Sequence, residues 1–523
     1  MTTPPLALTP AARPSHDLAA VAAHLPGAEL DQLEPVAAGD IGRLQVTGLT
    51  LASGRVTPGD LFAALPGLKT HGAKYAQVAL EAGAAAVLTD PAGAALVPAG
   101  TPLVVAPEIR AHLGALAAWF YGHPAADLTT VGVTGTNGKT TVAHMVQAAL
   151  AEDLGQVGLL GTIMAAVGEV RIASQRTTLE APDLQAAFAA MRERGVAACV
   201  MEVSSHAIDQ HRVDGFQFDV AAFTNLSRDH LDYHGTMEAY FEAKARLFTP
   251  AHAKRAIINL EDPWGASLAR LAGVPAETIS RQAGAADWHL QAGVPSRGRT
   301  AFTLVGPGGR QLAGEVDIPG DYNVANAAVA LLVAVAAGAS PEGAARGIAG
   351  LPGVPGRMEK VPGPAHAPLV VVDYAHAPES VAQALAALRP HTAGRLIAVV
   401  GAGGDRDHGK RPLMGAAAAA GADVVFVTDD NPRSEPPGAI RAVVFEAASR
   451  AMRRKAQARG QVFEVAERDQ AIERAIAGAG PDDTVVILGK GHEATIDYGG
   501  ILVEHSDREC AQRVLAKQRG VGA

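Results

Sequence analysis

The stretch of this sequence with the clearest chemistry is a glycine-rich loop that ends in a lysine and two threonines. Residues 131–141 read VGVTGTNGKTT, after an apolar run typical of a strand and before the helical pattern VAHMVQAALAE. Such a loop presents backbone N–H groups and a helix amino end to a phosphate chain, with Lys139 as the neutralising cation. The hydroxyl of Thr140 can bind Mg²⁺, which prefers oxygen ligands. The residues predicted to hold the phosphates are Gly135, Thr136, Asn137, Gly138, Lys139, Thr140 and Thr141.

The spacing of this loop is a variant. The common P-loop has a glycine at the place of Val133, whereas Gly132 comes one residue early here. A glycine turn with a chance GKT is the plain alternative. Because strand, glycines, GKTT and helix follow in the expected order, we favour phosphate binding.

Polar residues also gather after two later apolar runs. Glu202 closes the run AACVMEV, where a carboxylate is well placed to meet Mg²⁺ beside bound phosphates. A loop with Ser204 and Arg212 follows, and the next run, VAAFTNL, leads into a segment rich in Asp and His. Polar groups at two strand ends indicate a site.

The histidines of that segment leave two readings open. His230 and His234 stand four residues apart, as zinc ligands on a helix can, but no other soft ligand lies nearby in the sequence. The phosphate loop favours Mg²⁺ instead. Capping and turns explain Asp232 and His234 well.

The elements that must position these residues alternate along the whole chain. Short apolar runs such as TTVGVTG, AACVMEV, LVVVDYA, RLIAVVGAG, DVVFVTDD and TVVILGKG are separated by Ala-rich helical stretches. Several runs end in Gly, Asp or Ser, as buried parallel strands do. We predict an α/β fold with functional loops at the carboxyl ends of strands. The pattern divides into three predicted domains over residues 1–108, 109–357 and 358–523.

Bulk composition narrows the class of protein. A chain of 523 residues is too long for one core, and 48% hydrophobic residues favour a globular protein. The net charge of −9 and the lack of a basic run argue against nucleic-acid binding. Cys199 and Cys510 are the only cysteines, which suits a reducing cytoplasm. We expect no signal peptide and no membrane span, since the apolar stretch 327–337 is too short.

Taken together, the motifs resemble the Mur ligase family of ATP-dependent amide-bond-forming enzymes. They are GVTGTNGKTT, MEVSSH, FTNLSRDHLDYHG, EAKARLF, GDYNVANAAVA, GRME, VVDYAHAPES, GAGGDRDHGKRPLMG, DNPRSE and LGKGHE. The likeness covers the chain after about residue 45 and is strongest to the branch that adds a diamino acid to UDP-N-acetylmuramoyl-L-alanyl-D-glutamate in peptidoglycan synthesis. It implies an N-terminal domain for the UDP moiety, a central P-loop-type ATPase domain and a C-terminal Rossmann-like domain for the amino acid.

The resemblance implies roles around ATP. Lys139 would bind the β- and γ-phosphates, and Thr140 and Glu202 match Mg²⁺ ligands. His230 and Lys244 match a second metal site at which the family's lysine carries a CO2-derived carbamate. Lys139, Lys244, His230 and Glu202 form the predicted catalytic set. The nucleotide contacts implied beyond the loop are Asn323, Asn326, Arg357, Asp373 and His376.

The resemblance also implies two substrate sites. Residues that match contacts to the UDP-muramyl dipeptide are Ser53, Gln175, Arg176, Thr177, Thr178, Ser204, Gln210 and Arg212. Residues that match the pocket for the incoming amino acid are Arg406, Asp430, Asn431, Pro432, Arg433, Gly489 and Glu493. The family's N-terminal domains usually read LDSR before PGDLF, whereas this chain reads LASGRVTPGDLF, so Ala52 and Gly54 replace a charged pair.

Without the resemblance, several of these residues would mean little. Lys244 lies in a helical pattern, where a lysine is normally a solvated surface charge. Arg433 reads first as a loop arginine that faces solvent or pairs with Glu435, and His376 as a strand cap.

The implied reaction is ligation through an acyl phosphate, with meso-diaminopimelate as the expected amino acid and lysine or ornithine as alternatives. DNPRSE and GKGHE weigh against a folylpolyglutamate synthase or the ligase that adds D-Ala-D-Ala. A P-loop ATPase that moves a partner without ligation is the alternative from another class. We expect a monomer.

Overall fold

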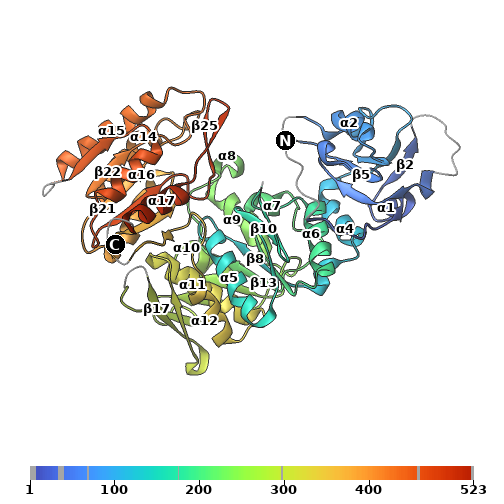
Figure 1. Cartoon of the computed structure of the whole chain (residues 1–523). Coiled ribbons are helices and arrows are strands. Elements are labelled where there is room, and N and C mark those ends of the chain that lie inside the picture. The colour runs from blue at the N-terminus through green and yellow to red at the C-terminus, as the bar shows by residue number, and fades with distance from the viewer. Residues whose placement is uncertain are drawn as a thin grey trace. The chain divides into compact units, whose positions relative to one another are not determined.

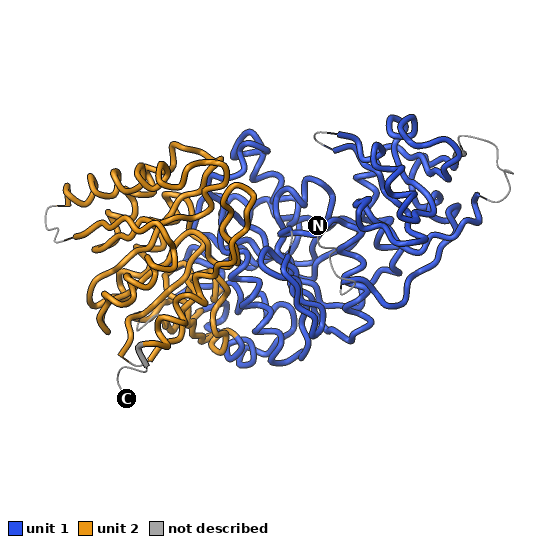
Figure 2. Tube along the Cα trace, turned by 45° about the horizontal axis from the view of Figure 1, so that its top comes forward, with its two compact units in different colours: residues 1–290, 305–310, 329–347 blue, residues 291–304, 311–328, 348–523 orange. Residues whose placement is uncertain are grey.

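The computed structural model describes residues 8–32, 41–67, 70–174, 176–295, 299–364, 366–455 and 460–519. The chain divides into two compact units, drawn in blue and orange in Figure 2. Unit 1 comprises residues 1–290, 305–310 and 329–347, and unit 2 comprises residues 291–304, 311–328 and 348–523. The three predicted domain ranges stay predictions. No helix within the described ranges is both long and apolar enough to cross a bilayer.

The first sheet of unit 1 is formed by the N-terminal part of the chain. Its strands are, in sheet order, β2 (Glu29–Gln32), β7 (Pro102–Val105), β6 (Ala86–Thr89), β5 (Asp60–Ala64) and β4 (Gly48–Thr50). All pair in parallel except β2. Short strands β1 (His16–Asp17) and β3 (Gln45–Val46) pair beside it. The helices here are α1 (Leu18–Ala23), α2 (Ala76–Glu81), α3 (Pro91–Ala94) and α4 (Ile109–Phe120).

The second sheet of unit 1 carries the phosphate loop. Its strands within this unit are, in order, β11 (Val170–Ala173), β10 (Met164–Val167), β9 (Val157–Leu160), β12 (Ala198–Glu202), β8 (Thr129–Thr134), β13 (Val220–Phe223), β14 (Ala256–Asn259), β15 (Ala276–Ser280) and β16 (Trp288–Ala292). The run from β9 to β16 is parallel. Strands β9, β12, β13 and β14 are buried along their whole length, and β8 is buried from Thr130 on, as the sequence predicted for β8 and β12.

Helices and short turns flank this sheet (Figure 1). They are α5 (Lys139–Leu154), α6 (Ala181–Glu193), α7 (Ser205–Asp209), α8 (Leu231–His234), α9 (Met237–Ala245) and α10 (Pro263–Leu271), with α11 (Asp321–Ala336) and α12 (Pro341–Gly350) later in the chain. One apolar core joins α6 and α9 to the strands, with Phe188, Met191, Phe223 and Phe248 among its buried residues.

Unit 2 contains a six-stranded sheet. In order its strands are β19 (Glu359–Val361), β20 (Leu369–Asp373), β24 (Thr484–Leu488), β21 (Leu396–Val400), β22 (Val424–Val427) and β23 (Gln461–Glu464), all parallel except β19. Its helices are α13 (Pro378–Leu388), α14 (Lys410–Gly421), α15 (Pro437–Arg454), α16 (Arg468–Ala477) and α17 (Asp507–Arg519). The remaining strands are β17 (Thr300–Val305), β18 (Gln311–Val316), β25 (Thr495–Tyr498) and β26 (Ile501–Glu504), of which β25 and β26 form an antiparallel hairpin. The predicted α/β class is confirmed.

A fully buried ion pair joins α16 to α17 in unit 2. The guanidinium of Arg468 donates to Asp507 at 2.6 and 2.7 Å, and neither side chain is exposed. Arg468 also donates to the Leu488 carbonyl at 2.8 Å. Although burial raises it, Arg468 and His505 hold the pKa of Asp507 at about 2.

We predict that Asp507→Ala destabilises the protein by about 3–5 kcal/mol, because it leaves the Arg468 charge buried and unpaired. Urea unfolding followed by circular dichroism measures the loss. Glu446→Ala is the matched control, since Glu446 pairs with Arg450 at an exposed site, where a pair contributes about 0–1 kcal/mol. Equal destabilisation by the two variants would contradict the prediction.

Candidate active site

The phosphate loop follows the carboxyl end of β8 and leads directly into α5. Gly135 and Gly138 adopt φ angles of 150° and 83°, which favour glycine. A Cβ at Gly135 would lie 1.9 Å from the Thr224 hydroxyl oxygen, so no side chain fits there. Thr224 at the end of β13 donates to the Asn137 carbonyl at 2.6 Å, which ties the loop to the neighbouring strand. The loop is therefore held in one conformation before any phosphate binds.

The Lys139 ammonium lies over this loop. Its Nζ donates to the carbonyls of Gly135 at 2.9 Å and Thr136 at 2.8 Å. Lys139 is the first residue of α5, and the first N–H groups of a helix have no partner within it. The positive charge of Lys139 therefore lies at the amino end of this helix. The role of Lys139 as a phosphate clamp stays a prediction.

Thr140 and Glu202 form a buried oxygen pair beside the loop. The Thr140 hydroxyl donates to Glu202 Oε2 at 2.9 Å, and the Thr162 N–H donates to Oε1 at 2.7 Å. Glu202 is 1% exposed. It ends β12, opposite Val133 of β8, because the parallel register aligns the two strand ends. A hydroxyl and a carboxylate at this spacing suit a hard cation such as Mg²⁺.

Lys244 is buried, so its reading as a surface charge is wrong. Only 1% of the residue is exposed, and its Nζ donates to the Gly135 carbonyl at 3.0 Å. The same atom lies 4.7 Å from the centre of the Tyr240 ring. Burial, with a smaller effect from Lys139, lowers the pKa of Lys244 well below its ordinary value. The structure thus favours a neutral amine next to the phosphate loop.

His230 lies near Lys244 but remains half-exposed. It adopts a left-handed conformation, with φ 53°, directly before α8. Burial lowers its pKa, with Lys139 and Lys244 adding to the effect and Asp229 opposing it. Nε2 of His234 contacts the Ser205 hydroxyl at 2.9 Å. Within the described ranges, no group of three or more His, Cys, Asp or Glu side chains has the arrangement of a metal site.

Most of the predicted dipeptide-binding residues come together between β12 and α6. Thr178 donates to the Glu202 carbonyl at 2.9 Å and accepts from the Ser204 N–H at 3.1 Å. Arg212 donates to the Thr178 carbonyl at 3.2 Å and to Gln210 at 2.6 Å. Thr177 contacts Thr162 through their hydroxyls at 3.1 Å. Gln175 lies outside the described residues. Ser53 begins a short 3-10 helix, Ser53–Arg55, in the N-terminal sheet region.

Glu180 organises this region, although no sequence motif singled it out. Its carboxylate pairs with Arg176 at 2.6 Å, Arg212 at 3.1 Å and Arg110 at 3.8 Å. Arg55, from the variant LASGR segment, pairs with Asp183 of α6. Apart from the Arg176–Glu180 pair, these contacts join residues far apart in the chain, and so only the folded structure reveals either role.

The predicted nucleotide residues of the later segments lie in unit 2. Asn323 donates to the Pro319 carbonyl at 2.7 Å and accepts from Asn326 at 3.1 Å, and both are buried. The Asp373 carboxylate accepts the N–H groups of Met358 at 2.7 Å and Ala375 at 2.9 Å. The Arg357 guanidinium lies 4.9 Å from the centre of the Tyr374 ring. Burial raises the pKa of Asp373.

A cavity of about 240 Å³ in unit 2 opens where β20, β21, β22 and β24 end. Six of the seven residues predicted for the amino acid line it, whereas Pro432 does not. The six are Arg406, Asp430, Asn431, Arg433, Gly489 and Glu493. His376 also lines it, as do Tyr374, Lys410 and Met414, which the sequence did not single out.

The charges around this cavity are unbalanced. Lys490 is fully buried and donates to Glu493 at 2.8 Å, and Asn431 donates to the same carboxylate at 2.9 Å. Although burial raises it, these bonds hold the pKa of Glu493 below its ordinary value. Arg433 donates to the Gly404 carbonyl at 2.7 Å and pairs with no carboxylate among the described residues. Glu435 pairs with Arg411 at 2.7 Å, so the reading of Arg433 as its partner is wrong.

Comparison with known proteins assigns the family. Residues 45–121 match the description "Mur ligase family, catalytic domain", residues 133–334 "Mur ligase middle domain" and residues 356–491 "Mur ligase, glutamate ligase domain". A relative from Streptomyces coelicolor is 46% identical over 95% of this chain and 97% of its own length. The chain belongs to the Mur ligase family.

The names and structures of relatives add detail. That Streptomyces coelicolor protein is named UDP-N-acetylmuramoyl-L-alanyl-D-glutamate–2,6-diaminopimelate ligase. A relative from Leifsonia xyli, 44% identical over 91% of this chain and 93% of its own length, is named UDP-N-acetylmuramyl-tripeptide synthetase. A solved structure of the former kind of ligase is 33% identical, covers 93% of this chain and 98% of its own, and has a TM-score of 0.68. MurF from Acinetobacter baumannii, 18% identical with a TM-score of 0.60, shares the fold.

We predict that Lys139→Ala leaves the protein folded and lowers the rate of ATP turnover by roughly 10²-fold or more, as loss of other transition-state charge stabilisers does. Phosphate release and thermal unfolding are the two measurements. Lys74→Ala, at an exposed lysine, is the matched control and should retain both. A folded Lys139→Ala variant with near-normal turnover would exclude the phosphate-clamp role.

Proposed function

We propose that this protein ligates meso-diaminopimelate to UDP-N-acetylmuramoyl-L-alanyl-D-glutamate, with conversion of ATP to ADP and phosphate, in peptidoglycan synthesis. The observation that carries the amino-acid choice is the unbalanced charge of the unit 2 cavity. Arg406, Lys410 and Arg433 line it together with Asp430, while Glu493 is already paired with Lys490. Meso-diaminopimelate brings two carboxylates, whereas lysine and ornithine bring one. The names of the diaminopimelate-adding relatives support the same choice.

The reaction begins at the phosphate loop. The D-glutamate side-chain carboxylate attacks the γ-phosphorus of ATP, and ADP leaves, which yields an acyl phosphate. The amine of the incoming amino acid then attacks the acyl carbon, and phosphate leaves with formation of the amide bond. Lys139 screens the repulsion between the carboxylate and the γ-phosphate. Thr140 and Glu202 would hold Mg²⁺, which would supply further charge neutralisation there.

The side chains around Thr178 are proposed to hold the dipeptide end of the nucleotide substrate. Thr178, Ser204, Gln210 and Arg212 already form one hydrogen-bonded group beside Glu202. The Arg212 Nε is buried and makes no hydrogen bond to a described residue, so it can still donate. A carboxylate of an anionic peptide can accept a hydrogen bond from this Nε and can pair with the charges of the arginines around Glu180.

Phosphate release separates this function from that of an ATPase that only moves a partner. We predict that phosphate is released only when the UDP-muramyl dipeptide and the amino acid are both present. Release with ATP alone at the full rate would favour the partner-driving ATPase. Turnover with lysine or ornithine but not diaminopimelate would change the amino acid and leave the ligase assignment intact.

Lys244 is proposed to carry a carbamate. A neutral amine attacks CO2 and loses a proton, and the product is an anionic oxygen donor. The lowered pKa of the buried Lys244 supplies the neutral amine, and the oxygen donor suits Mg²⁺ beside His230, where an ammonium would repel it.

We predict that the protein equilibrated with ¹³C-bicarbonate shows a carbamate ¹³C NMR signal that is lost in Lys244→Ala. Lys74→Ala, which removes an exposed lysine, is the matched control and should keep the signal. Lys244→Ala should also lose ligase activity, with partial rescue by acetate. A signal unchanged in Lys244→Ala would place the carbamate elsewhere.

We predict that Arg433→Ala raises the KM for diaminopimelate at least ~30-fold, since removal of one partner of a buried charge pair costs ~2–5 kcal/mol. The KM for the UDP-muramyl dipeptide should change little. Arg450→Ala removes an arginine from an exposed pair and serves as the control. Unchanged KM for diaminopimelate in a folded Arg433→Ala variant would remove Arg433 from substrate recognition.

A further inference from the structure

A second cavity, of about 520 Å³, lies in unit 1 at the amino edge of the large sheet. Thr129, which begins β8, lines it, as do Ala197 and Asp219 directly before β12 and β13. The phosphate loop follows the opposite, carboxyl end of β8, so this cavity is separate from the candidate active site. Its volume lies in the range of small-molecule sites. None of the roles proposed above uses it.

The cavity has firm walls. A Cβ at Gly114 of α4 would lie 2.5 Å from the Asp214 carbonyl oxygen, and a Cβ at Gly215 would lie 2.4 Å from the Gly114 carbonyl oxygen. Only glycines allow this backbone contact, which fixes the 214–219 loop against α4. Asp214 is further held by His211 at 2.7 Å and His252 at 3.1 Å. The cavity therefore exists before any ligand binds.

One buried polar atom in the wall has no partner. Gln185 of α6 lines the cavity and is 1% exposed, and its Oε1 accepts no hydrogen bond from a described residue. An unpaired buried acceptor destabilises the fold, because it has lost its hydrogen bonds to water. A ligand with an N–H donor would satisfy it.

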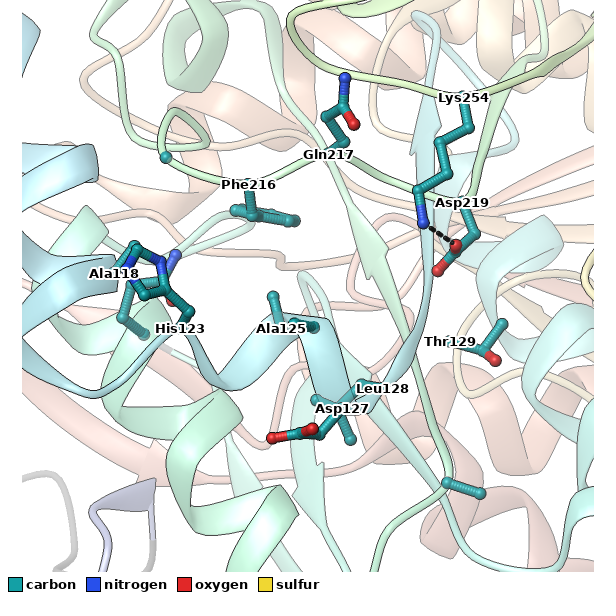
Figure 3. Close-up of a pocket in the computed structure, with 14 residues that line it drawn as sticks. Ala118, His123, Ala125, Asp127, Leu128, Thr129, Phe216, Gln217, Asp219 and Lys254 are labelled. Atoms are coloured by element: carbon teal, nitrogen blue, oxygen red, sulfur yellow. Dashed lines mark hydrogen bonds and ion pairs between the residues drawn. The ribbon is translucent and has the colours of Figure 1, made fainter.

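Phe216 supplies an aromatic surface in the same wall. Its ring meets those of Phe188 and Phe218 edge to face, with centres 5.1 and 4.8 Å away, so its plane is fixed by its neighbours. Figure 3 shows Phe216, His123, Asp127 and the Asp219–Lys254 ion pair arranged around the open space. Flat heterocycles stack on such rings.

The charges of the cavity are already paired. Asp219 accepts from Lys254 at 2.7 Å, and Asp127 lies 3.5 Å from Arg192. The two carboxylates can accept hydroxyl hydrogen bonds but repel a phosphate group. The ligand chemistry that fits is a neutral one.

We propose that this cavity binds a neutral nucleoside with an adenine-type base. A glutamine amide matches adenine in two bonds, as its oxygen accepts from the exocyclic amino group and its nitrogen donates to N7. The base stacks on the ring of Phe216, and the carboxylates of Asp127 and Asp219 accept hydrogen bonds from the ribose hydroxyls. Inosine presents a carbonyl in place of the amino group and sets an acceptor against Gln185 Oε1. The site thus discriminates between two nucleosides of nearly equal shape.

Equilibrium dialysis of the whole protein with radiolabelled adenosine and, separately, inosine tests the proposal. We expect saturable adenosine binding with a Kd of about 1 mM or tighter, and inosine binding weaker by roughly tenfold. Gln185→Leu should lose the difference between the two nucleosides and bind adenosine roughly tenfold more weakly. Its thermal stability and ligase activity should be retained, because an unpaired buried acceptor is replaced by an apolar group of similar size.

Gln217→Ala is the matched control, since Gln217 lines the same cavity but its amide already donates to the Pro250 carbonyl. It should bind adenosine as the wild type does. If Gln185→Leu fails to fold, the comparison of adenosine with inosine on the wild type decides. Absence of saturable adenosine binding, equal binding of the two nucleosides, or unchanged binding by Gln185→Leu would each overturn the proposal.

Discussion

The parallel register of β12, β8 and β13 is the constraint on which the candidate active site depends. It aligns Glu202 with Val133 and Phe223 with Thr134, so the three strands end at one edge of the sheet. The phosphate loop, the carboxylate that faces Thr140 and the Thr224 hydroxyl that holds the loop are thereby adjacent without any long-range adjustment. A slip of one residue in β12 would turn Glu202 to the other face of the sheet and leave Thr140 without its partner.

The burial of Lys244 is the most demanding consequence of that arrangement. A lysine ammonium that is 1% exposed and lies near Lys139 is costly, and the Gly135 carbonyl and the Tyr240 ring compensate only part of the cost. Burial lowers the pKa of Lys244, which reduces this cost because it favours the neutral amine over the ammonium. A lysine with a purely structural role would be more stable at the surface, where water solvates its ammonium. The burial of Lys244 therefore argues for a chemical role.

The sequence predicted the strands and the phosphate loop because both depend on local signals, namely continuous apolar runs and glycines followed by GKTT. It predicted Glu202 for the same reason, since the residue that ends a buried strand reaches the functional edge. It could not predict Glu180, whose role arises from three arginines that come from α4, the 174–180 segment and the 210–212 segment. Local sequence patterns also gave wrong interpretations of Lys244 and Arg433. The burial of Lys244 and the choice of partner for Arg433 depend on tertiary packing, which local patterns do not contain.

The two units use strand ends in the same way but differ in how charge is balanced. In unit 1, the Lys139 ammonium is set against backbone carbonyls at the loop, so its charge is available to phosphate oxygens. In unit 2, carboxylates are first matched internally, as the partly exposed Glu493 is with Lys490 and the buried Asp507 is with Arg468. The cations that remain at the cavity are those without such partners, and Arg433 is the clearest among the described residues. A lysine side chain would bring its ammonium toward these cations, whereas a distal carboxylate would complete the pairing. Selectivity then follows from the positive charge that the fold leaves unpaired. The shape of the cavity has only to keep water from solvating these cations in place of the substrate.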